Sequence, residues 1–314
     1  GIADMNVAYD QHSASSVRGK MCFEEPMATH TSWRCGGTAA RFFEPADRQD
    51  LVNYLCDVGS ETEILWLGLG SNMLVRDGGL RQTVIATSPG LTRLTWIDEQ
   101  VVYAESGVTC AKLAREAAAH DRAGLEFLAG IPGTVGGALR MNAGALGGEI
   151  WSFVETVETI EPGGQIQTMA ASAYVPGYRN VAGERLSFLG AWFRLPQPAD
   201  GAGRARIRQV IAERAETQPI GKFSCGSVFK NPPGDFAGRL IENSGFKGHR
   251  SGGAQVSVLH ANFIINDGNA TASDIEALID EVIAGVEKAT GVTLETEVHI
   301  VGMPPVSQPK GGQR

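Results

Sequence analysis

Glycine-rich loops constrain this chain more than any other feature of its sequence. The chain has 314 residues, of which 40 are glycine, roughly twice the usual share of ~7%. These glycines follow no collagen-like period and form no low-complexity run. Glycine permits tight turns and lets the backbone lie directly against a ligand. The sequence therefore predicts a folded protein with many tight turns and with loops close to a ligand.

The first glycine loop follows an apolar run at 64–67, which predicts a buried strand. A dinucleotide-binding βαβ fingerprint needs a third glycine at position 73, where the chain has Met73, and no Gly-Lys-Ser/Thr follows to form a P-loop. What remains is a strand-to-turn loop with bare backbone N–H groups, which suits a pyrophosphate. We expect the ligand to be bound by Gly68, Leu69, Gly70, Ser71, Asn72, Met73 and Leu74.

A second glycine-rich segment lies further along the chain. Its small residues allow the backbone to contact a flat or phosphorylated ligand where any Cβ atom would clash. Either loop alone is equally compatible with a simple tight turn, but the two together favour ligand binding. The residues expected to contribute are Gly130, Ile131, Pro132, Gly133, Gly136, Gly137, Asn142, Ala143 and Gly144.

Charge and cysteine usage narrow the class of protein further. The formal net charge of −8 disfavours nucleic acid as a partner, because phosphate-backbone binding needs a basic surface. The five cysteines are scattered and never spaced C-x-x-C, so we expect neither a disulfide framework nor a metal site, and a reducing compartment. No apolar run reaches the ~18–20 residues of a membrane helix. A cytoplasmic protein without membrane insertion is predicted.

The sequence also predicts the order of its elements. Strands are expected at 64–67 and 101–104, a hairpin at 154–168 with its turn at 162–164, and helices at 110–120 and 204–216. The clearest helix covers 273–290, with a Ser273/Glu276 capping box and Gly291 after its end. Residues 294–300 alternate as a strand with Glu295, Glu297 and His299 on one face.

Several motifs together resemble one enzyme family. They are T-S-W-R-C-G-G at 31–37, G-L-G-S-N-M-L at 68–74, G-I-P-G-T-V-G-G-A at 130–138, M-N-A-G-A at 141–145, C-G-S-V-F-K-N-P at 225–232 and L-E-T-E-V at 294–298. In order and spacing they resemble the UDP-N-acetylenolpyruvylglucosamine reductases (the MurB family). The resemblance covers residues 22–302, which is nearly the whole chain.

The resemblance implies an α+β fold. It consists of a two-subdomain FAD-binding fold of the vanillyl-alcohol-oxidase type and a C-terminal α+β substrate domain. We expect an N-terminal arm at 1–20, FAD-binding subdomains at 21–90 and 91–200, a substrate-binding domain at 201–303 and a flexible tail at 304–314. The short stretch between Arg179 and Ser227 implies the class that lacks an additional tyrosine-bearing loop.

The resemblance also implies a reaction and its cofactors. NADPH gives a hydride to non-covalently bound FAD, and the flavin passes it to C3 of UDP-N-acetylglucosamine enolpyruvate, a step of peptidoglycan synthesis. Negative charge then develops on the substrate carboxylate and C2, so the site must supply a cation and a proton. By their matching positions, Arg179 is expected to neutralise this charge, Ser227 to donate the proton and Glu297 to assist protonation.

Further residues match the substrate-binding part of the family pattern. Tyr178, Lys230, Asn231 and His260 are expected to contact the UDP-sugar substrate. The chain departs from the family in two places: Asn180 and Val181 follow Arg179 where a serine is usual, and His299 stands where arginine is usual. The oligomeric state is left open, with a monomer favoured.

Two other functions are compatible with parts of the sequence. Another FAD-dependent oxidase or dehydrogenase of the same fold explains the glycine loops but not the motifs at 225–232 and 294–298. A flavin-binding or nucleotide-sugar-sensing protein without activity explains the fold, but it is disfavoured by the joint presence of Arg179, Ser227 and Glu297.

Overall fold

The structure is a computed structural model that describes residues 17–305. Residues 1–16 of the predicted arm and 306–314 of the predicted tail lie outside the described residues. The end of the predicted arm packs against the fold: the backbone N–H groups of Arg18 and Gly19 donate to the Asp50 carboxylate at 2.6 and 2.8 Å. Asp50 belongs to the first helix, so this segment is fixed by a buried carboxylate.

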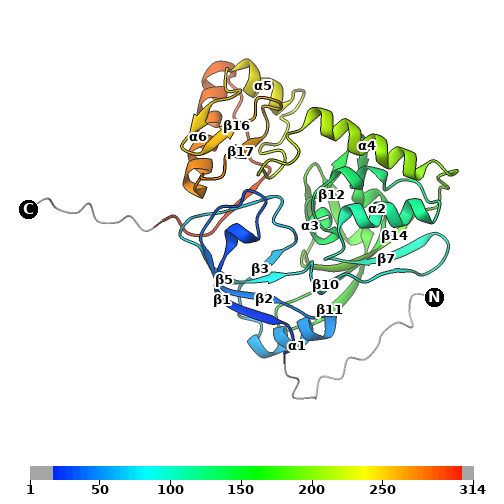
Figure 1. The fold of residues 1–314 in the computed structure, drawn as a ribbon. Helices are drawn as coiled ribbons and strands as arrows, with labels where there is room; N and C mark the ends of the chain where they lie inside the picture. Colours follow the sequence, from blue (N-terminus) through cyan, green and yellow to red (C-terminus); the bar gives the residue numbers. More distant parts are fainter. Residues whose placement is uncertain (1–16, 306–314) are drawn as a thin grey trace, which may run out of the picture.

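Helices and strands are both present throughout the described chain (Figure 1). The helices are α1 (Arg48–Val58), α2 (Cys110–Ala119), α3 (Val135–Arg140), α4 (Gly203–Thr217), α5 (Ala237–Asn243) and α6 (Ala272–Thr290). The strands of the first half are β1 (Lys20–Pro26), β2 (Thr38–Glu44), β3 (Ile64–Leu67), β4 (Met73–Val75), β5 (Leu80–Ala86), β6 (Leu94–Trp96), β7 (Val101–Glu105), β8 (Gly144–Ala145) and β9 (Gly148–Glu149). Those of the second half are β10 (Val154–Ile160), β11 (Ile166–Ala170), β12 (Val175–Gly177), β13 (Asn180–Ala182), β14 (Phe188–Arg194), β15 (Arg250–Ser251), β16 (Ala254–Val256), β17 (Ile264–Asn266) and β18 (His299–Val301).

The first group of elements is a four-stranded sheet in the order β1-β2-β5-β3. β1 and β2 are antiparallel, whereas β2 and β3 both run parallel to β5. The apolar side chains of α1 pack on this sheet around the fully buried Phe43 and Leu51. The first glycine loop therefore begins where β3 leaves a well-packed sheet.

The second group is a five-stranded antiparallel sheet in the order β11-β10-β14-β7-β6. Its largest core contains buried side chains of α2, α3 and α4 together with those of the sheet, including Leu113, Leu139 and Phe193. The second glycine loop runs directly into α3, so this core holds it in place.

The third group contains the small sheet β15-β16-β17 with α5 and α6, shown in yellow to orange in Figure 1. One face of α6 is fully buried, including Ile275, Leu278 and Val286. The same core includes Trp33 and Leu74 from the first quarter of the chain.

Segments distant in sequence join these groups. Strand β18 pairs in parallel with β4, so His299 lies opposite Met73. The Trp33 indole N–H donates to the Ile264 carbonyl at 2.8 Å, and the Asn266 amide donates to the Trp33 carbonyl at 2.7 Å. The C-terminal strand β18 and the segment around Trp33 therefore lie beside the first glycine loop and the strand that follows it.

Most predicted elements are confirmed. The strands at 64–67 and 101–104, the hairpin that turns at 162–164, and the helices at 110–120, 204–216 and 273–290 all form within two residues of their expected bounds. Gly291 ends α6 with a left-handed φ of 75°, which glycine adopts without steric cost.

Two local predictions are wrong. The capping box of α6 is formed by Thr271 and Asp274, because Ser273 instead donates to Asp77 and Glu276 binds Arg76. The predicted strand at 294–300 forms only at its end, as β18. Its earlier residues pair with an irregular segment, where Glu297 N–H donates to the Val228 carbonyl at 2.7 Å.

Candidate functional site

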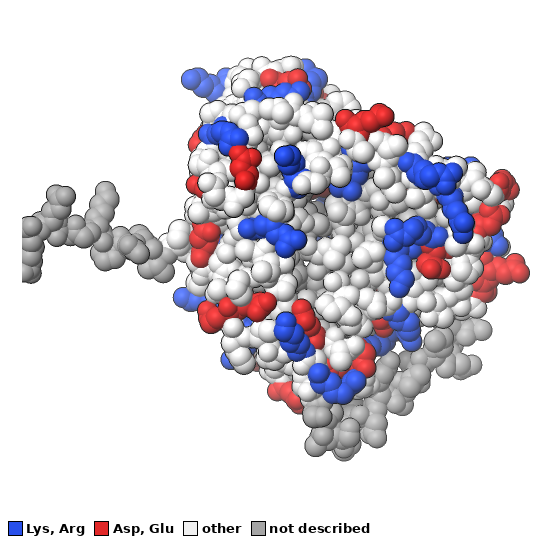
Figure 2. All heavy atoms as spheres, in the orientation of Figure 1, with Lys and Arg blue, Asp and Glu red and all other residues white. Residues whose placement is uncertain are grey.

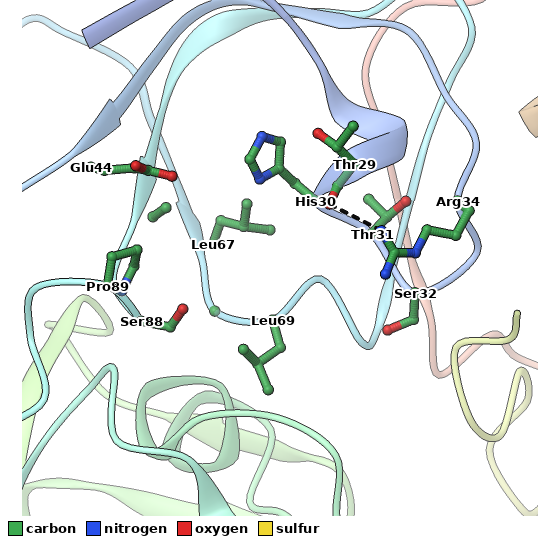
Figure 3. Close-up of a pocket in the computed structure, with 12 residues that line it drawn as sticks. Thr29, His30, Thr31, Ser32, Arg34, Glu44, Leu67, Leu69, Ser88 and Pro89 are labelled. Atoms are coloured by element: carbon green, nitrogen blue, oxygen red, sulfur yellow. Dashed lines mark hydrogen bonds between the residues drawn. The ribbon is translucent and has the colours of Figure 1, made fainter. Parts of the chain in front are cut away.

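A cavity of about 220 Å³ opens beside the first glycine loop (Figure 3). Leu67, Gly68 and Leu69 form one part of its wall. The rest comes from the turn after β1 and from residues near the ends of β2 and β5, namely Thr29, His30, Thr31, Ser32, Arg34, Glu44, Ala86, Ser88 and Pro89. Figure 3 places Arg34 and Ser32 on the side opposite Glu44 and Pro89.

Sequence reasoning named none of these additional residues as a site. Residues 31–37 carry part of the family resemblance, and the sequence alone gives them no role at the site. A sequence signal for such a role exists, because Thr31-Ser-Trp-Arg-Cys-Gly-Gly combines hydroxyl groups, a cation and two glycines, but it does not show that the segment reaches the first loop.

The two glycine loops lie in contact with each other. The Ser71 hydroxyl donates to the Pro132 carbonyl at 2.8 Å. A Cβ atom added to Gly68 would lie 2.5 Å from the Thr134 hydroxyl oxygen, and one added to Gly133 would lie 3.3 Å from the Ser71 hydroxyl oxygen. The loops that were predicted separately therefore form one continuous surface.

Backbone N–H groups with no partner line this surface. Within residues 17–305, the N–H groups of residues 68–72 donate no hydrogen bond, and neither do those of Gly133, Thr134 and Gly137. Gly70 and Thr134 are buried, and a buried N–H without a partner is rare in folded proteins. A row of free donors suits an anionic group, so these residues fit the diphosphate of FAD.

The glycines of the two loops differ in what surrounds them. A Cβ atom on Gly70 would overlap the His30 carbonyl oxygen, and one on Gly136 would lie 2.8 Å from the Ser106 Cβ atom. Protein packing alone therefore requires glycine at these two positions. A Cβ atom on Gly137 meets nothing within 4 Å among the described residues, so Gly137 leaves open space beside α3.

The remaining expected loop residues have mixed surroundings. Leu69 is 42% exposed and faces the cavity, whereas Leu74 is buried in a core. Met73, Ile131 and Ala143 pack against cores, and Gly130 lies against α4, near Val210. Asn72 donates from its amide to the Glu297 carbonyl at 3.2 Å, which links the first loop to a predicted catalytic residue.

A second cavity, of about 440 Å³, contains the three predicted catalytic residues. Arg179, Ser227 and Glu297 come from three separate segments, and all line its wall. Phe229, Phe236, Gly238, Arg239, Glu242, Leu259, Ala261 and Asn262 complete the wall with the substrate residues described below. Figure 2 shows Lys and Arg side chains around the hollowed, mostly uncharged centre of the face where the three groups of elements meet.

Arg179 lies at the tip of the β12–β13 hairpin and forms an ion pair across the cavity. Its Nε atom is 3.0 Å from the Glu297 Oε1 atom. This pair is an ion pair without hydrogen-bond geometry, because the Nε–H is buried and has no acceptor in line. Arg179 has a φ of 53°, a backbone conformation that is strained for any residue except glycine, asparagine or aspartate.

Glu297 is largely buried, with 17% of its side chain exposed. Burial raises the pKa of its carboxyl group above the ordinary value, although the charges of Arg179 and Lys230 oppose that rise. A carboxyl group with a raised pKa keeps its proton to higher pH and can take part in proton transfer. Glu297 therefore differs from Glu295 on the same predicted face, whose side chain is 78% exposed.

Ser227 follows Gly226, which has a left-handed φ of 67°. The next residue, Val228, accepts from the Glu297 N–H and donates to the Asn262 carbonyl, so the backbone on this side of Ser227 is held firmly. The Ser227 hydroxyl group makes no hydrogen bond to another residue of the described part of the chain. Ser227 therefore has a fixed backbone and a hydroxyl group available to a ligand.

Three of the four expected substrate residues line the same cavity, namely Tyr178, Asn231 and His260. The Asn231 N–H donates to the Tyr178 hydroxyl at 3.1 Å, which connects the hairpin to the third group of elements. Burial lowers the pKa of His260, which favours its neutral form. The fourth, Lys230, does not line the cavity; its ammonium lies 3.6 Å from Glu295.

The side chain of Asn142 is occupied by protein groups. It is 1% exposed and donates from Nδ2 to Glu149 at 3.0 Å and to the Gly177 carbonyl at 2.9 Å. Gly144 is next to the catalytic cation, because a Cβ atom there would lie 3.4 Å from the Arg179 Nη1 atom. Both residues lie between the second glycine loop and the hairpin that carries Arg179.

The departures from the family pattern have clear positions. His299 Nε2 lies 3.0 Å from the Met141 sulfur atom, and burial lowers the pKa of this histidine. Asn180 and Val181 belong to β13, where Val181 is buried and contributes to a core.

Two negative findings apply to residues 17–305. None of their helices combines the length and apolar character needed to cross a bilayer. Their His, Cys, Asp and Glu side chains form no group of three or more that could hold a metal ion.

Known proteins match this chain along most of its length. Residues 39–170 match the family described as FAD binding domain, and residues 218–301 match the UDP-N-acetylenolpyruvoylglucosamine reductase, C-terminal domain. The UDP-N-acetylenolpyruvoylglucosamine reductase of Methylococcus capsulatus is 52% identical, covering 92% of this chain and 96% of the relative. That of Thiobacillus denitrificans is 48% identical, with 92% and 94% covered.

A solved structure shows the same arrangement. The UDP-N-acetylenolpyruvylglucosamine reductase (MurB) of Thermus caldophilus matches with a TM-score of 0.73 and 32% identity, over 90% of this chain and 98% of that one. The fold, the free N–H groups and these matches define an FAD-dependent oxidoreductase. The chain belongs to the UDP-N-acetylenolpyruvoylglucosamine reductase family. The predicted fold class, FAD cofactor and enzyme class are confirmed.

Proposed function

We propose that this chain reduces the enolpyruvyl group of UDP-N-acetylglucosamine enolpyruvate to give UDP-N-acetylmuramate, with Arg179, Ser227 and Glu297 as its catalytic residues. Family membership supports the reaction and its place in peptidoglycan synthesis. The assignment of these residues rests on one observation. They come from three separate segments of the chain, and all three line the same cavity.

The two glycine loops hold FAD in this proposal. The free N–H groups of residues 68–72, Gly133, Thr134 and Gly137 bind its diphosphate, and the adjoining cavity takes further parts of the cofactor. When bound, FAD accepts a hydride from NADPH and supplies it to C3 of the enolpyruvyl group. Asn72 of the first loop donates to the Glu297 carbonyl, so a direct hydrogen bond connects the cofactor loop to the catalytic cavity.

The catalytic residues then stabilise and protonate the substrate. Arg179 holds the substrate carboxylate and neutralises the negative charge that develops on it and on C2. The Ser227 hydroxyl donates a proton to C2, which completes the reduced C2–C3 bond. Glu297, whose pKa burial raises, assists this proton transfer and lies next to the Arg179 guanidinium.

The UDP part of the substrate extends along the third group of elements. This part of the second cavity is lined by Tyr178, Asn231 and His260. Lys230 adds positive charge next to the cavity. We propose domains at 21–90, 91–200 and 201–303, with one larger sheet in each of the first two and α5 and α6 in the third. Helix α4 belongs to the third range but packs against the core of the second. We place this protein in the cytoplasm, where its nucleotide-sugar substrate is made, and favour a monomer.

Separate measurement of the two half-reactions tests the role of Ser227. Ser227→Ala should bind FAD and accept hydride from NADPH at nearly the parent rate. Oxidation of the reduced flavin by the enolpyruvyl substrate should slow by ~10²–10⁴-fold, the usual cost of removing a general acid. Ser227→Cys should recover part of this rate. Ser172→Ala, at an exposed serine, is the matched control.

Stopped-flow absorbance of the flavin measures both half-reactions. Equal slowing of the two would make Ser227 a structural residue of the flavin pocket, and unimpaired substrate reduction would remove it from the mechanism. The purified protein should be yellow, and acid should release its FAD. A colourless protein that cannot be reconstituted with FAD would contradict the cofactor site.

A further inference from the structure

The catalytic Arg179 lies on the short β12–β13 hairpin, which contributes Val181 to a core but leaves its first strand exposed. Among the strands of residues 17–305, β12 and β13 pair only with each other, and Val175, Pro176 and Gly177 are exposed. Tyr178 and Arg179 form its two-residue turn, in which Arg179 has a φ of 53°. Holding a non-glycine residue in this conformation requires contacts from the surroundings.

Asn142 supplies such a contact through its side-chain amide, which bonds to the backbone of the hairpin. Its Nδ2 group donates to the carbonyl oxygen of Gly177, two residues before Arg179, at 2.9 Å. The same group donates to Glu149 of β9 at 3.0 Å. These two bonds use both hydrogens of the amide nitrogen, so Asn142 joins the end of the second glycine loop to the hairpin.

The position of Asn142 is itself fixed. Its side chain is 1% exposed, and its φ of 44° lies in the left-handed region that asparagine tolerates. The segment that follows lies against the guanidinium, because a Cβ atom on Gly144 would lie 3.4 Å from the Arg179 Nη1 atom. Arg179 is thus held at its backbone through Asn142 and at its guanidinium by Glu297.

We propose that Asn142 is a positioning residue for Arg179 and not a cofactor ligand through its side chain. The inference rests on the proposed role of Arg179. Asn142 fixes the hairpin so that the guanidinium meets the substrate carboxylate without first reorganising. A loss of such positioning by about 1 Å commonly costs ~10²-fold in rate, and that loss falls on the half-reaction in which Arg179 takes part.

Asn142→Asp is the direct test. Aspartate has the same shape and tolerates the left-handed conformation, but it replaces the donor with an acceptor that faces Glu149 and the Gly177 carbonyl. FAD affinity and flavin reduction by NADPH should remain within about twofold of the parent. Reduction of the enolpyruvyl substrate should slow by ~10–10²-fold. Gln167→Glu adds the same charge on the exposed edge of β11 and should have no effect.

A double-mutant cycle separates positioning from a general structural role. In an Arg179→Ala background, Asn142→Asp should cause no further slowing of substrate reduction. An equal slowing in both backgrounds, or a large loss of FAD affinity, would overturn the proposal. If Asn142→Asp does not fold, Asn142→Gly keeps the left-handed backbone, removes the amide and must show the same pattern.

The same variants distinguish an error in the positioning role of Asn142 from an error in the catalytic role of Arg179. If Arg179→Ala leaves substrate reduction unimpaired, the catalytic role of Arg179 is wrong. If Arg179→Ala slows that step but both Asn142 variants reduce substrate at the parent rate, only the positioning role is wrong.

Discussion

Replacing Gly137 by alanine adds one methyl group on a side of α3 where no described residue lies within 4 Å. In the apoprotein this change should leave the free energy of unfolding unchanged or raise it by up to ~1 kcal/mol, because alanine favours a helix more than glycine does. If FAD occupies the open space, the methyl group overpacks the complex at a cost of ~1–3 kcal/mol. FAD affinity should therefore fall by about 5- to 150-fold.

The neighbouring residue provides a matched control with the same chemical change. A Cβ atom on Gly136 lies 2.8 Å from the Ser106 Cβ atom, inside the protein. Gly136→Ala should therefore lower the free energy of unfolding of the apoprotein by ~1–3 kcal/mol. The two variants should thus separate cofactor contact from internal packing at adjacent positions.

Urea unfolding of the apoproteins and titration with FAD, followed by flavin fluorescence, measure the two effects. The prediction is that Gly137→Ala loses affinity without losing stability, whereas Gly136→Ala loses stability. Parent-like FAD affinity in Gly137→Ala refutes the placement of the cofactor beside α3. A loss of apoprotein stability in Gly137→Ala would show that the space beside Gly137 is not open in the protein.

Further substitutions test the packing and the electrostatics. Gly70→Val should lower both FAD occupancy and apoprotein Tm, because its Cβ atom overlaps the His30 carbonyl; an unchanged Tm by calorimetry contradicts this. Leu278→Ala should cost ~2–5 kcal/mol in urea unfolding, since Leu278 is fully buried; a loss below 1 kcal/mol contradicts this. Burial raises the pKa of Glu297, so the parent loses stability as pH rises from about 4 through that pKa. Glu297→Gln should therefore gain stability relative to the parent over this range, and a pH-independent difference contradicts this.

Local patterns predicted elements better than they predicted contacts. The apolar stripe of α6 was readable because a buried helix face repeats along the sequence. Its capping box was not, because Ser273 and Glu276 bind Asp77 and Arg76 from a distant turn. Nothing within the α6 segment records those partners.

At the candidate site, too, the local pattern predicted the element but not its contacts. The alternation at 294–300 correctly separated Glu297 from Leu294 and Val298, but it could not show which of its polar residues is covered. Glu295 is 78% exposed, whereas Glu297 is covered by the hairpin of Arg179. Burial of one carboxylate and not the other depends on an element distant in the chain.

The pairing of β18 with β4 has a consequence for the synthesis of this protein. His299 and Ile300 lie opposite Met73 and Leu74, and the Glu297 carbonyl accepts from Asn72. A ribosome makes the first glycine loop 225 residues before the segment that supports it, as the separation of Asn72 and Glu297 shows. The nascent chain therefore carries an unsupported cofactor loop until β18 has been made, and stable FAD binding should begin only after the synthesis of that strand.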